Sequence, residues 1–309
     1  MTSVKKYFSL IKFSHTIFAL PFALIGFSIG VHSIYFSNND VLINTNSIFH
    51  WVAPTTNGFN TILFKLLLVL VCMITARSAA MAFNRYLDRN FDAINPRTAI
   101  REIPAGIISP NGALRFTILS CILFLIACFF INSICFYLAP IALFVILFYS
   151  YTKRFTAFCH LVLGLGLSLA PIGAYLAVTG KFDLLPILFS FAVLFWVGGF
   201  DIIYALQDVE FDQSQKLFSI PSVIGKTKAL HVSIFLHILS ASCIIAAGVY
   251  GQGHLFYWLG TILFIGMLFY QHSIVSPNDL SKVNLAFMTA NGIASVVFGI
   301  FVIVDLFVY

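Results

Sequence analysis

The chain has 309 residues, of which 60% are hydrophobic and only 9% are charged. Soluble domains carry roughly 25% charged residues, so this composition excludes a soluble protein and indicates an all-α protein embedded in a membrane. The net charge of +6 comes from Lys and Arg that are scattered between apolar segments rather than gathered on one face, so no nucleic-acid partner is expected.

The apolar segments, taken in chain order, predict about nine transmembrane helices. The first follows Lys5, Lys6 and Lys12, and because it is long and lacks a small-residue cleavage site we expect an uncleaved span. The short connections leave no room for a soluble domain, so residues 1–309 are predicted to form a single polytopic domain. The predicted helices cover residues 14–36, 59–87, 113–131, 134–151, 157–178, 184–206, 228–250, 253–271 and 283–307.

The basic residues predict how the chain is oriented. Lys and Arg precede the first span and occur in every second connection, whereas the opposite set of connections contributes only Lys181. Connections on the cytoplasmic side of a membrane carry an excess of Lys and Arg. The N-terminus is therefore expected in the cytoplasm.

Acidic residues gather in two short stretches, which hold seven of the eleven Asp and Glu. Within each stretch polar side chains recur about every four residues, and residues four apart share one face of a helix. Both stretches lie at the predicted cytoplasmic ends of even-numbered spans, so we expect one reaction centre at that face. The two columns consist of Asn84, Asp88 and Asp92, and of Asp201, Tyr204, Asp208 and Asp212.

Two facing columns of carboxylates at a membrane edge need cations to stay ionised. Mg²⁺ is the natural one, because it prefers hard oxygen ligands and keeps positions for water and substrate phosphates. A lone acid near a helix end, such as Asp279, is usually solvated, but two matched columns favour a functional site. The predicted metal ligands are Asp88, Asp92, Asp208 and Asp212.

Arginines follow and precede the first column. Arg97 and Arg101 lie after it in the segment NPRTAIREIPAG, where their guanidinium groups can bind a diphosphate in a bidentate way. Arg77 lies seven residues before Asn84, on about the same face of the second span. A buried ion pair with one of the acids or a contact to substrate would each explain Arg77, and both stay open. Two acid columns with nearby Arg predict a site for a Mg²⁺-bound diphosphate.

Three motifs carry a resemblance to a known family. They are NRYLDRNFDAINPRTAIREIPAG at 84–106, YSYTKR at 149–154 and DIIYALQDVEFD at 201–212. Together, and in this order, they resemble the UbiA superfamily of intramembrane aromatic prenyltransferases, over essentially the whole chain. The resemblance implies a bundle of nine helices around a central cavity, with a cytoplasmic cap formed by the connections that carry the Asp motifs. Glu102 departs from the commoner family pattern, which has Pro after the loop Arg.

The resemblance also implies roles for individual residues. The Asp and Asn side chains of the two columns, including Asp201, would bind the diphosphate through Mg²⁺. Arg154 is the candidate partner of an acidic acceptor ring. The phosphate contacts implied are Arg97, Arg101 and Lys153. The aromatic faces that could stabilise an allylic cation are Tyr149, Tyr151 and Tyr204.

The function implied is transfer of a polyprenyl group from a prenyl diphosphate to an aromatic acid of the 4-hydroxybenzoate type, for quinone synthesis in a bacterial inner membrane. Lipid would receive the polyprenyl tail, and the active site would face the cytoplasm. A dihydroxynaphthoate that serves menaquinone synthesis is the alternative acceptor; homogentisate, chlorophyllide and haem b are others. A secondary transporter is the alternative from another class, although transporters tend to place their charged residues near the middle of the membrane.

Overall fold

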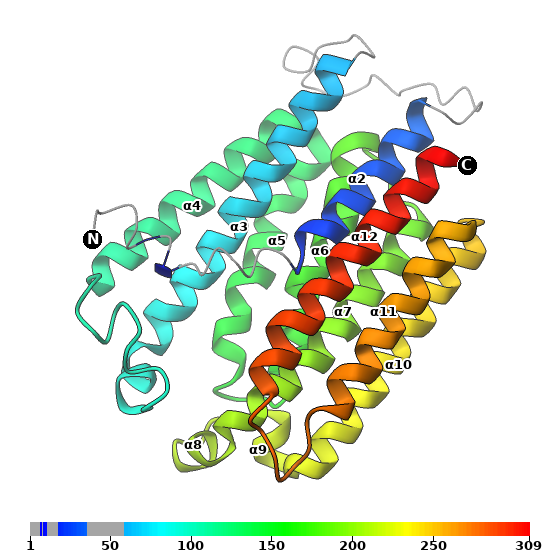
Figure 1. The fold of residues 1–309 in the computed structure, drawn as a ribbon. Coiled ribbons are helices and arrows are strands. Elements are labelled where there is room, and N and C mark those ends of the chain that lie inside the picture. The colour runs from blue at the N-terminus through cyan, green and yellow to red at the C-terminus, as the bar shows by residue number, and fades with distance from the viewer. Residues whose placement is uncertain (1–6, 8, 11–17, 36–58) are drawn as a thin grey trace.

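The computed structural model describes residues 7, 9–10, 18–35 and 59–309, and these form a bundle of long helices with no sheet (Figure 1). The predicted all-α fold class is confirmed. The elements are α2 (Leu20–Tyr35), α3 (Phe59–Ile94), α4 (Pro110–Ile131), α5 (Ser133–Thr152), α6 (Cys159–Thr179), α7 (Leu184–Ala205), η2 (Leu206–Asp208), α8 (Val209–Ser214), α9 (Ile220–Ile224), α10 (Lys226–Tyr250), α11 (Leu255–Ser273), the π-helix η3 (Leu285–Ala290) and α12 (Asn291–Val308).

Eight of the described helices are long and apolar enough to cross a membrane, and Leu20–Ile34 is a shorter apolar helix. The count of nine is thus approximate. The predicted beginning of the first span, at residues 14–17, lies outside the described residues. The second span runs to Ile94, beyond its predicted end at residue 87, because polar residues continue the helix past the apolar segment.

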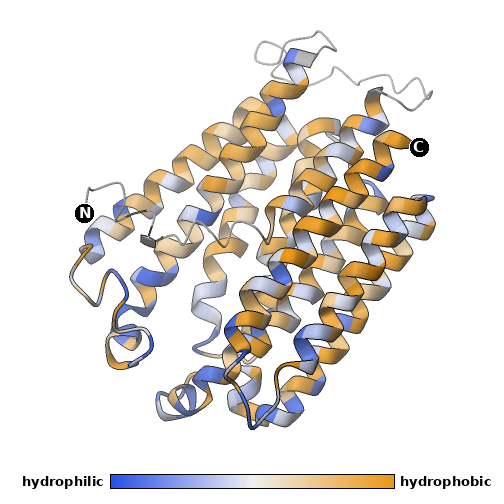
Figure 2. Cartoon of the chain, viewed as in Figure 1, coloured by the Kyte–Doolittle hydropathy of each residue, from blue (hydrophilic) through white to orange (hydrophobic). Residues whose placement is uncertain are grey.

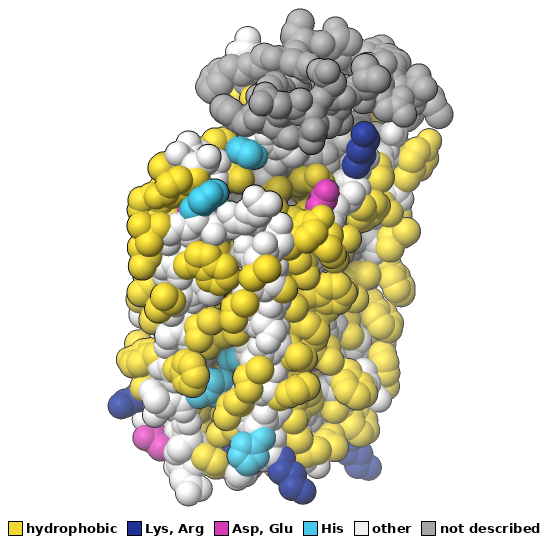
Figure 3. Space-filling view, turned by 90° about the vertical axis from the view of Figure 1, so that its right-hand side faces the viewer, with side chains coloured by type: hydrophobic (Ala, Val, Ile, Leu, Met, Phe, Trp, Pro, Cys, Tyr) yellow, Lys and Arg dark blue, Asp and Glu magenta, His cyan; other side chains and the backbone are white. Residues whose placement is uncertain are grey.

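The centre of the bundle is an aromatic core around α7. Trp196 is fully buried and packs on Phe22 of α2 and Phe200 of α7, with ring centroids 5.4 and 5.1 Å away. The Trp196 indole N–H donates to Asn291 Oδ1 at 2.9 Å, which satisfies its polar group. Figure 2 shows that the long helices are hydrophobic along most of their length. Figure 3 shows one face covered largely by hydrophobic side chains, with most of its Lys and Arg near the lower end. This pattern fits helices whose outer faces contact lipid.

Two helices approach so closely that only glycine fits between them. A Cβ added to Gly26 of α2 would lie 2.0 Å from the carbonyl oxygen of Pro171 in α6. Small residues allow such contacts in membrane helices, where packing and not hydrophobicity drives association. Gly26 thereby holds α2 against α6, beside the aromatic core.

One end of the bundle carries a cap. The connection 95–109, the turn 153–158 and the short helices α8 and α9 all lie at the lower end in Figure 1, the end predicted to be cytoplasmic. Glu102 in this connection accepts a hydrogen bond from the Ser9 hydroxyl at 2.5 Å, and Leu10 is fully buried beside it. Glu102 therefore joins the cap to the N-terminal segment.

Candidate active site

A polar cavity of about 290 Å³ lies inside the capped end of the bundle. It is enclosed by α3, the connection after it, and the adjoining ends of α5, α6 and α7. The structure brings eleven of the twelve predicted site residues into its lining: Asn84, Asp88, Asp92, Arg97, Arg101, Tyr149, Lys153, Arg154, Asp201, Tyr204 and Asp208. The two columns, distant in sequence, therefore share one cavity.

The first column is held by arginines. Asp88 accepts a hydrogen bond from the Asn84 amide at 3.0 Å and another from Arg154 at 2.9 Å. Asp92 is buried and pairs with Arg101 at 2.6 Å, while Arg85 lies 3.9 Å from its second oxygen. Asp88 thus lines the cavity and is held by Asn84 and Arg154. Asp92 is buried between the two cations Arg101 and Arg85.

The second column is tied to the connection after α3 by Arg97. The guanidinium of Arg97 donates to both oxygens of Asp208, with its Nε 3.0 Å from Oδ1, and also donates to the Tyr204 hydroxyl at 2.9 Å. Burial disfavours the charge of Arg97, but the Asp208 carboxylate outweighs burial and raises the pKa of Arg97 above its ordinary value. The paired hydrogen bonds from Arg97 to Asp208 therefore link the connection after α3 to η2 across the cavity.

Asp212 is the predicted site residue that does not line the cavity. Its side chain is fully buried and bonds to the Lys153 ammonium at 2.7 Å and to the Ser219 hydroxyl at 2.9 Å. Burial disfavours the charge of Lys153, but Asp212 outweighs it and raises the pKa of Lys153. Asp212 therefore joins the turn after α5 to the segment before α9.

Arg154 lies differently from what the motif suggested. It donates to Asp88 and to the backbone carbonyls of Ser150 and Leu87, at 2.9 to 3.1 Å. These hydrogen bonds lie on the side of the first column, where a diphosphate is expected. Tyr151 is 48% exposed, packs under Arg154 and is absent from the lining of the polar cavity.

Six basic and four acidic side chains line the polar cavity, and because Lys153 is paired with Asp212 behind the lining, the excess is one positive charge. Such an excess in a partly enclosed cavity attracts an anionic ligand. The basic residues are Arg77, Arg85, Arg97, Arg101, Lys153 and Arg154, and the acids are Asp88, Asp92, Asp201 and Asp208.

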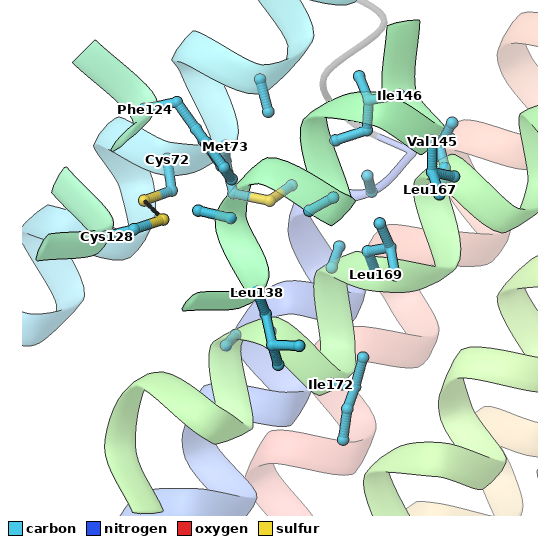
Figure 4. A pocket seen from close by; sticks show the side chains of 18 of the residues that line it. Cys72, Met73, Phe124, Cys128, Leu138, Val145, Ile146, Leu167, Leu169 and Ile172 are labelled. Atoms are coloured by element: carbon cyan, nitrogen blue, oxygen red, sulfur yellow. Dashed lines mark hydrogen bonds between the residues drawn. The ribbon is translucent and has the colours of Figure 1, made fainter. Parts of the chain in front are cut away.

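An apolar chamber of about 390 Å³ adjoins the polar cavity (Figure 4). It is bounded mainly by α3, α4, α5 and α6, and side chains such as Met73, Leu138 and Ile172 line it. Cys72 and Cys128 lie in its wall with their sulfur atoms 3.7 Å apart. The chamber can take a hydrocarbon chain.

The two cavities share part of their walls. Arg77, Met81, Tyr149, Leu163 and Leu167 line both. Arg77 forms no ion pair with the described residues, and its buried Nε has no hydrogen-bond partner there. Of the two explanations that the sequence left open for Arg77, the geometry favours contact with substrate.

Residues 41–293 match the UbiA prenyltransferase family. The chain belongs to this family. It is similar to the 4-hydroxybenzoate octaprenyltransferase of Tolumonas auensis, with 28% identity over 236 residues that cover 76% of this chain and 82% of the relative. The 4-hydroxybenzoate octaprenyltransferase of Nitrosomonas europaea is 30% identical over 234 residues, which cover 75% of this chain and 80% of the relative.

Solved UbiA homologues share the fold. A homologue from Aeropyrum pernix superposes with a TM-score of 0.74 at 25% identity, over 95% of this chain and 97% of that chain. A homologue from Archaeoglobus fulgidus, bound to GPP and Mg²⁺, has a TM-score of 0.70 at 19% identity, over 97% and 99% of the two chains. The protein is an integral membrane prenyltransferase, which decides against the transporter alternative.

The exposed fractions of the acidic side chains show which of them could bind a divalent cation in the polar cavity. The side chains of Asp88, Asp201 and Asp208 keep 26%, 24% and 13% exposure at the cavity, whereas Asp92 and Asp212 keep 7% and 0%. No group of three or more His, Cys, Asp or Glu among the described residues is arranged to hold a metal. Mg²⁺ commonly takes one or two carboxylates and completes its shell with water and phosphate, so the three acids that stay exposed at the cavity, Asp88, Asp201 and Asp208, fit as its donors. Metal roles for Asp88, Asp92, Asp208 and Asp212 stay predictions.

Two polar residues that line the polar cavity, Asn95 and His160, were not predicted from the sequence. Asn95 is buried, accepts from the Arg97 backbone N–H at 3.0 Å and lies 3.4 Å from Asp208. The Asn-Pro dipeptide at this position signals a turn, and this signal could have been used. His160 bonds to Asp201 at 2.7 Å; a single His in an apolar segment gives no comparable signal.

Proposed function

We propose that the protein transfers a polyprenyl group from a polyprenyl diphosphate to an aromatic acid of the 4-hydroxybenzoate type, in quinone biosynthesis. The observation that carries this proposal is the pair of adjoining cavities, one cationic and lined by carboxylates, the other apolar, with a shared wall. A polyprenyl diphosphate has the same division into an anionic head and a hydrocarbon tail. The names of the relatives from Tolumonas auensis and Nitrosomonas europaea support the acceptor.

In this proposal, the diphosphate lies between Arg97 and Arg101 on one side and Lys153 on the other. All three line the polar cavity and each is held by an acid, so their charges are oriented before the substrate binds. Bound Mg²⁺, held by Asp88 and Asp208, would stabilise negative charge on the departing diphosphate. Asn84 orients Asp88 through its amide hydrogen bond.

The acceptor carboxylate is assigned to Arg77 rather than to Arg154. Arg77 lies at the junction of the two cavities and forms no ion pair with the described residues, whereas Arg154 is paired with Asp88 beside the expected diphosphate. A ring held by Arg77 would lie where the diphosphate head meets the tail. That is where the allylic carbon of the donor must be.

The chemical step breaks the allylic C–O bond, and its electron pair leaves with the diphosphate. A carbon of the electron-rich ring then forms the new C–C bond, and the ring loses a proton. Tyr149 lines both cavities at this position, and Tyr204 lines the polar one; their π faces stabilise the allylic cation. The apolar side chains of the shared wall, Leu163 and Leu167, keep water from it.

The capped end is proposed to face the cytoplasm of a bacterium, with the protein in the inner membrane. Support comes from the Lys and Arg of alternate connections. Charged substrates made in the cytoplasm would then reach the polar cavity directly, while the tail stays in lipid or in the apolar chamber.

The test uses purified protein in detergent with Mg²⁺, one polyprenyl diphosphate and a panel of aromatic acids that includes 4-hydroxybenzoate and a dihydroxynaphthoate. Mass spectrometry identifies the products. We expect the prenylated form of 4-hydroxybenzoate as the main product. Prenylation of the naphthoate alone would move the protein to the menaquinone branch, and no product with any aromatic acid would contradict the proposal.

A further inference from the structure

His160 lies at the beginning of α6 and is almost completely buried, with 2% of its surface exposed. Its Nδ1 lies 2.7 Å from Asp201 Oδ2, on α7. Its Nε2 accepts a hydrogen bond from the backbone N–H of Ile220, in α9, at 3.3 Å. One imidazole therefore joins three separate elements of the capped end.

These two contacts assign the tautomer of His160. A backbone N–H can only donate, so Nε2 must offer its lone pair to Ile220. A ring proton therefore lies on Nδ1 and is donated to Asp201. Asp201 has one oxygen held by His160, while its side chain keeps 24% exposure at the polar cavity.

The contact with Ile220 belongs to a larger attachment of the same segment. The Phe218 backbone N–H donates to the Lys153 carbonyl at 2.7 Å, and the Cys159 thiol lies 3.6 Å from the Phe218 carbonyl. Ser219 in turn donates to Asp212. Residues 218–220 are thus docked on the beginning of α6, next to the residues that hold the second acid column.

We propose that His160 is a positioning residue for prenyl diphosphate binding, acting through Asp201. It donates from Nδ1 and so holds the Asp201 carboxylate in the orientation that faces the polar cavity, where Asp201 would bind the diphosphate through Mg²⁺, while its Nε2 anchors α9. This inference rests on the proposed function only in taking a prenyl diphosphate as the ligand. Partners that orient a binding carboxylate typically change affinity or activity by about 10- to 100-fold when removed.

Substitutions at position 160 separate the two contacts. His160→Leu removes both, whereas His160→Asn keeps an amide N–H close to the place of Nδ1 and loses the acceptor for Ile220. If His160 acts through Asp201, the Leu variant loses affinity and the Asn variant keeps most of it. Asp201→Ala removes the partner, so adding His160→Leu to that variant should then have little further effect.

The experiment measures equilibrium binding of geranyl S-thiolodiphosphate, an unreactive prenyl diphosphate analogue, to purified full-length variants in Mg²⁺ buffer. We expect about 10- to 100-fold weaker binding for His160→Leu, near-normal binding for His160→Asn, and no additional loss in the double variant. His237→Asn is the matched control, because His237 is also buried in the bundle but bonds to His272 and to the Trp196 carbonyl and lines neither cavity. It should bind the analogue normally.

Three results would overturn the inference: unchanged affinity in a folded His160→Leu protein, equal losses in the Leu and Asn variants, or a full additional loss on the Asp201→Ala background. If His160→Leu does not fold, His160→Gln decides, because its amide oxygen can replace Nε2 as the acceptor for Ile220 while the donor to Asp201 is lost; normal binding by His160→Gln would overturn the inference. These failures concern His160 alone. The proposed function fails separately, when the unsubstituted protein binds the analogue but prenylates no aromatic acid.

Discussion

Replacing Arg77 by Ala should specifically weaken binding of the acidic acceptor. Arg77 lies where the two cavities join, and its Nε has no partner among the described residues, so truncation removes a bond to substrate without leaving an unpaired acid of the protein. A hydrogen bond to a charged group contributes about 1.5–3 kcal/mol. Since 1.4 kcal/mol is about a tenfold change, the KM for 4-hydroxybenzoate should rise by roughly 10- to 100-fold.

The assay compares 4-hydroxybenzoate with its neutral methyl ester at saturating prenyl diphosphate. The unsubstituted protein should prefer the acid, and Arg77→Ala should lose this preference with little change for the ester. Lys65→Ala is the control, because Lys65 lies on the same helix but bonds to the Val178 carbonyl and lines neither cavity. If Arg77→Ala keeps the preference for the acid, or raises only the KM for the diphosphate, the acceptor assignment is wrong.

Four further substitutions test other parts of the structure. Asp88→Ala and Asp208→Ala should each lower kcat by roughly 100-fold or more while the protein stays inserted in the membrane. Turnover is measured in purified membranes, and near-normal turnover of either variant would remove that residue from the proposed metal site. Lys153→Met leaves the fully buried Asp212 carboxylate without its cation. It should destabilise the protein by about 3 kcal/mol, the lower end for a broken buried ion pair, because the lysine is 35% exposed. An unchanged unfolding midpoint would contradict the pairing. Gly26→Ala forces α2 away from α6 and should lower the free energy of unfolding by about 1–3 kcal/mol. Gly173→Ala is the control, because its added Cβ has no atom within 4 Å, and it should leave the unfolding midpoint unchanged. Equal effects of the two substitutions would refute the close contact.

Much of the fold could be predicted because lipid accepts few backbone structures. A long apolar segment must form a helix there, and Lys and Arg mark its ends. What could not be predicted lies outside the apolar segments. The extension of α3 to Ile94 and the short helices α8 and α9 contain polar residues, whose structure depends on contacts with distant parts of the chain rather than on burial in lipid.

The candidate site, like the fold, could be predicted only in part from the sequence. The four-residue spacing aligned side chains within α3, and the basic connections placed both acid stretches at one end of the bundle, where Asp88 and Asp208 line one cavity. The partner of each acid could not be predicted in this way. Arg97 and Asp208 are 111 residues apart in the chain, and Arg154 turned out to be held by Asp88. Only the packing of the helices decides which cation meets which acid, and local spacing contains no information on it.

The most direct test of the proposed function is the mass of the product formed by the purified protein from a polyprenyl diphosphate and 4-hydroxybenzoate. The account predicts a prenylated 4-hydroxybenzoate that forms with Mg²⁺, disappears with EDTA, returns when Mg²⁺ is added back, and does not form with Asp208→Ala. Absence of this product with the unsubstituted protein, or its undiminished formation in EDTA, would contradict the account.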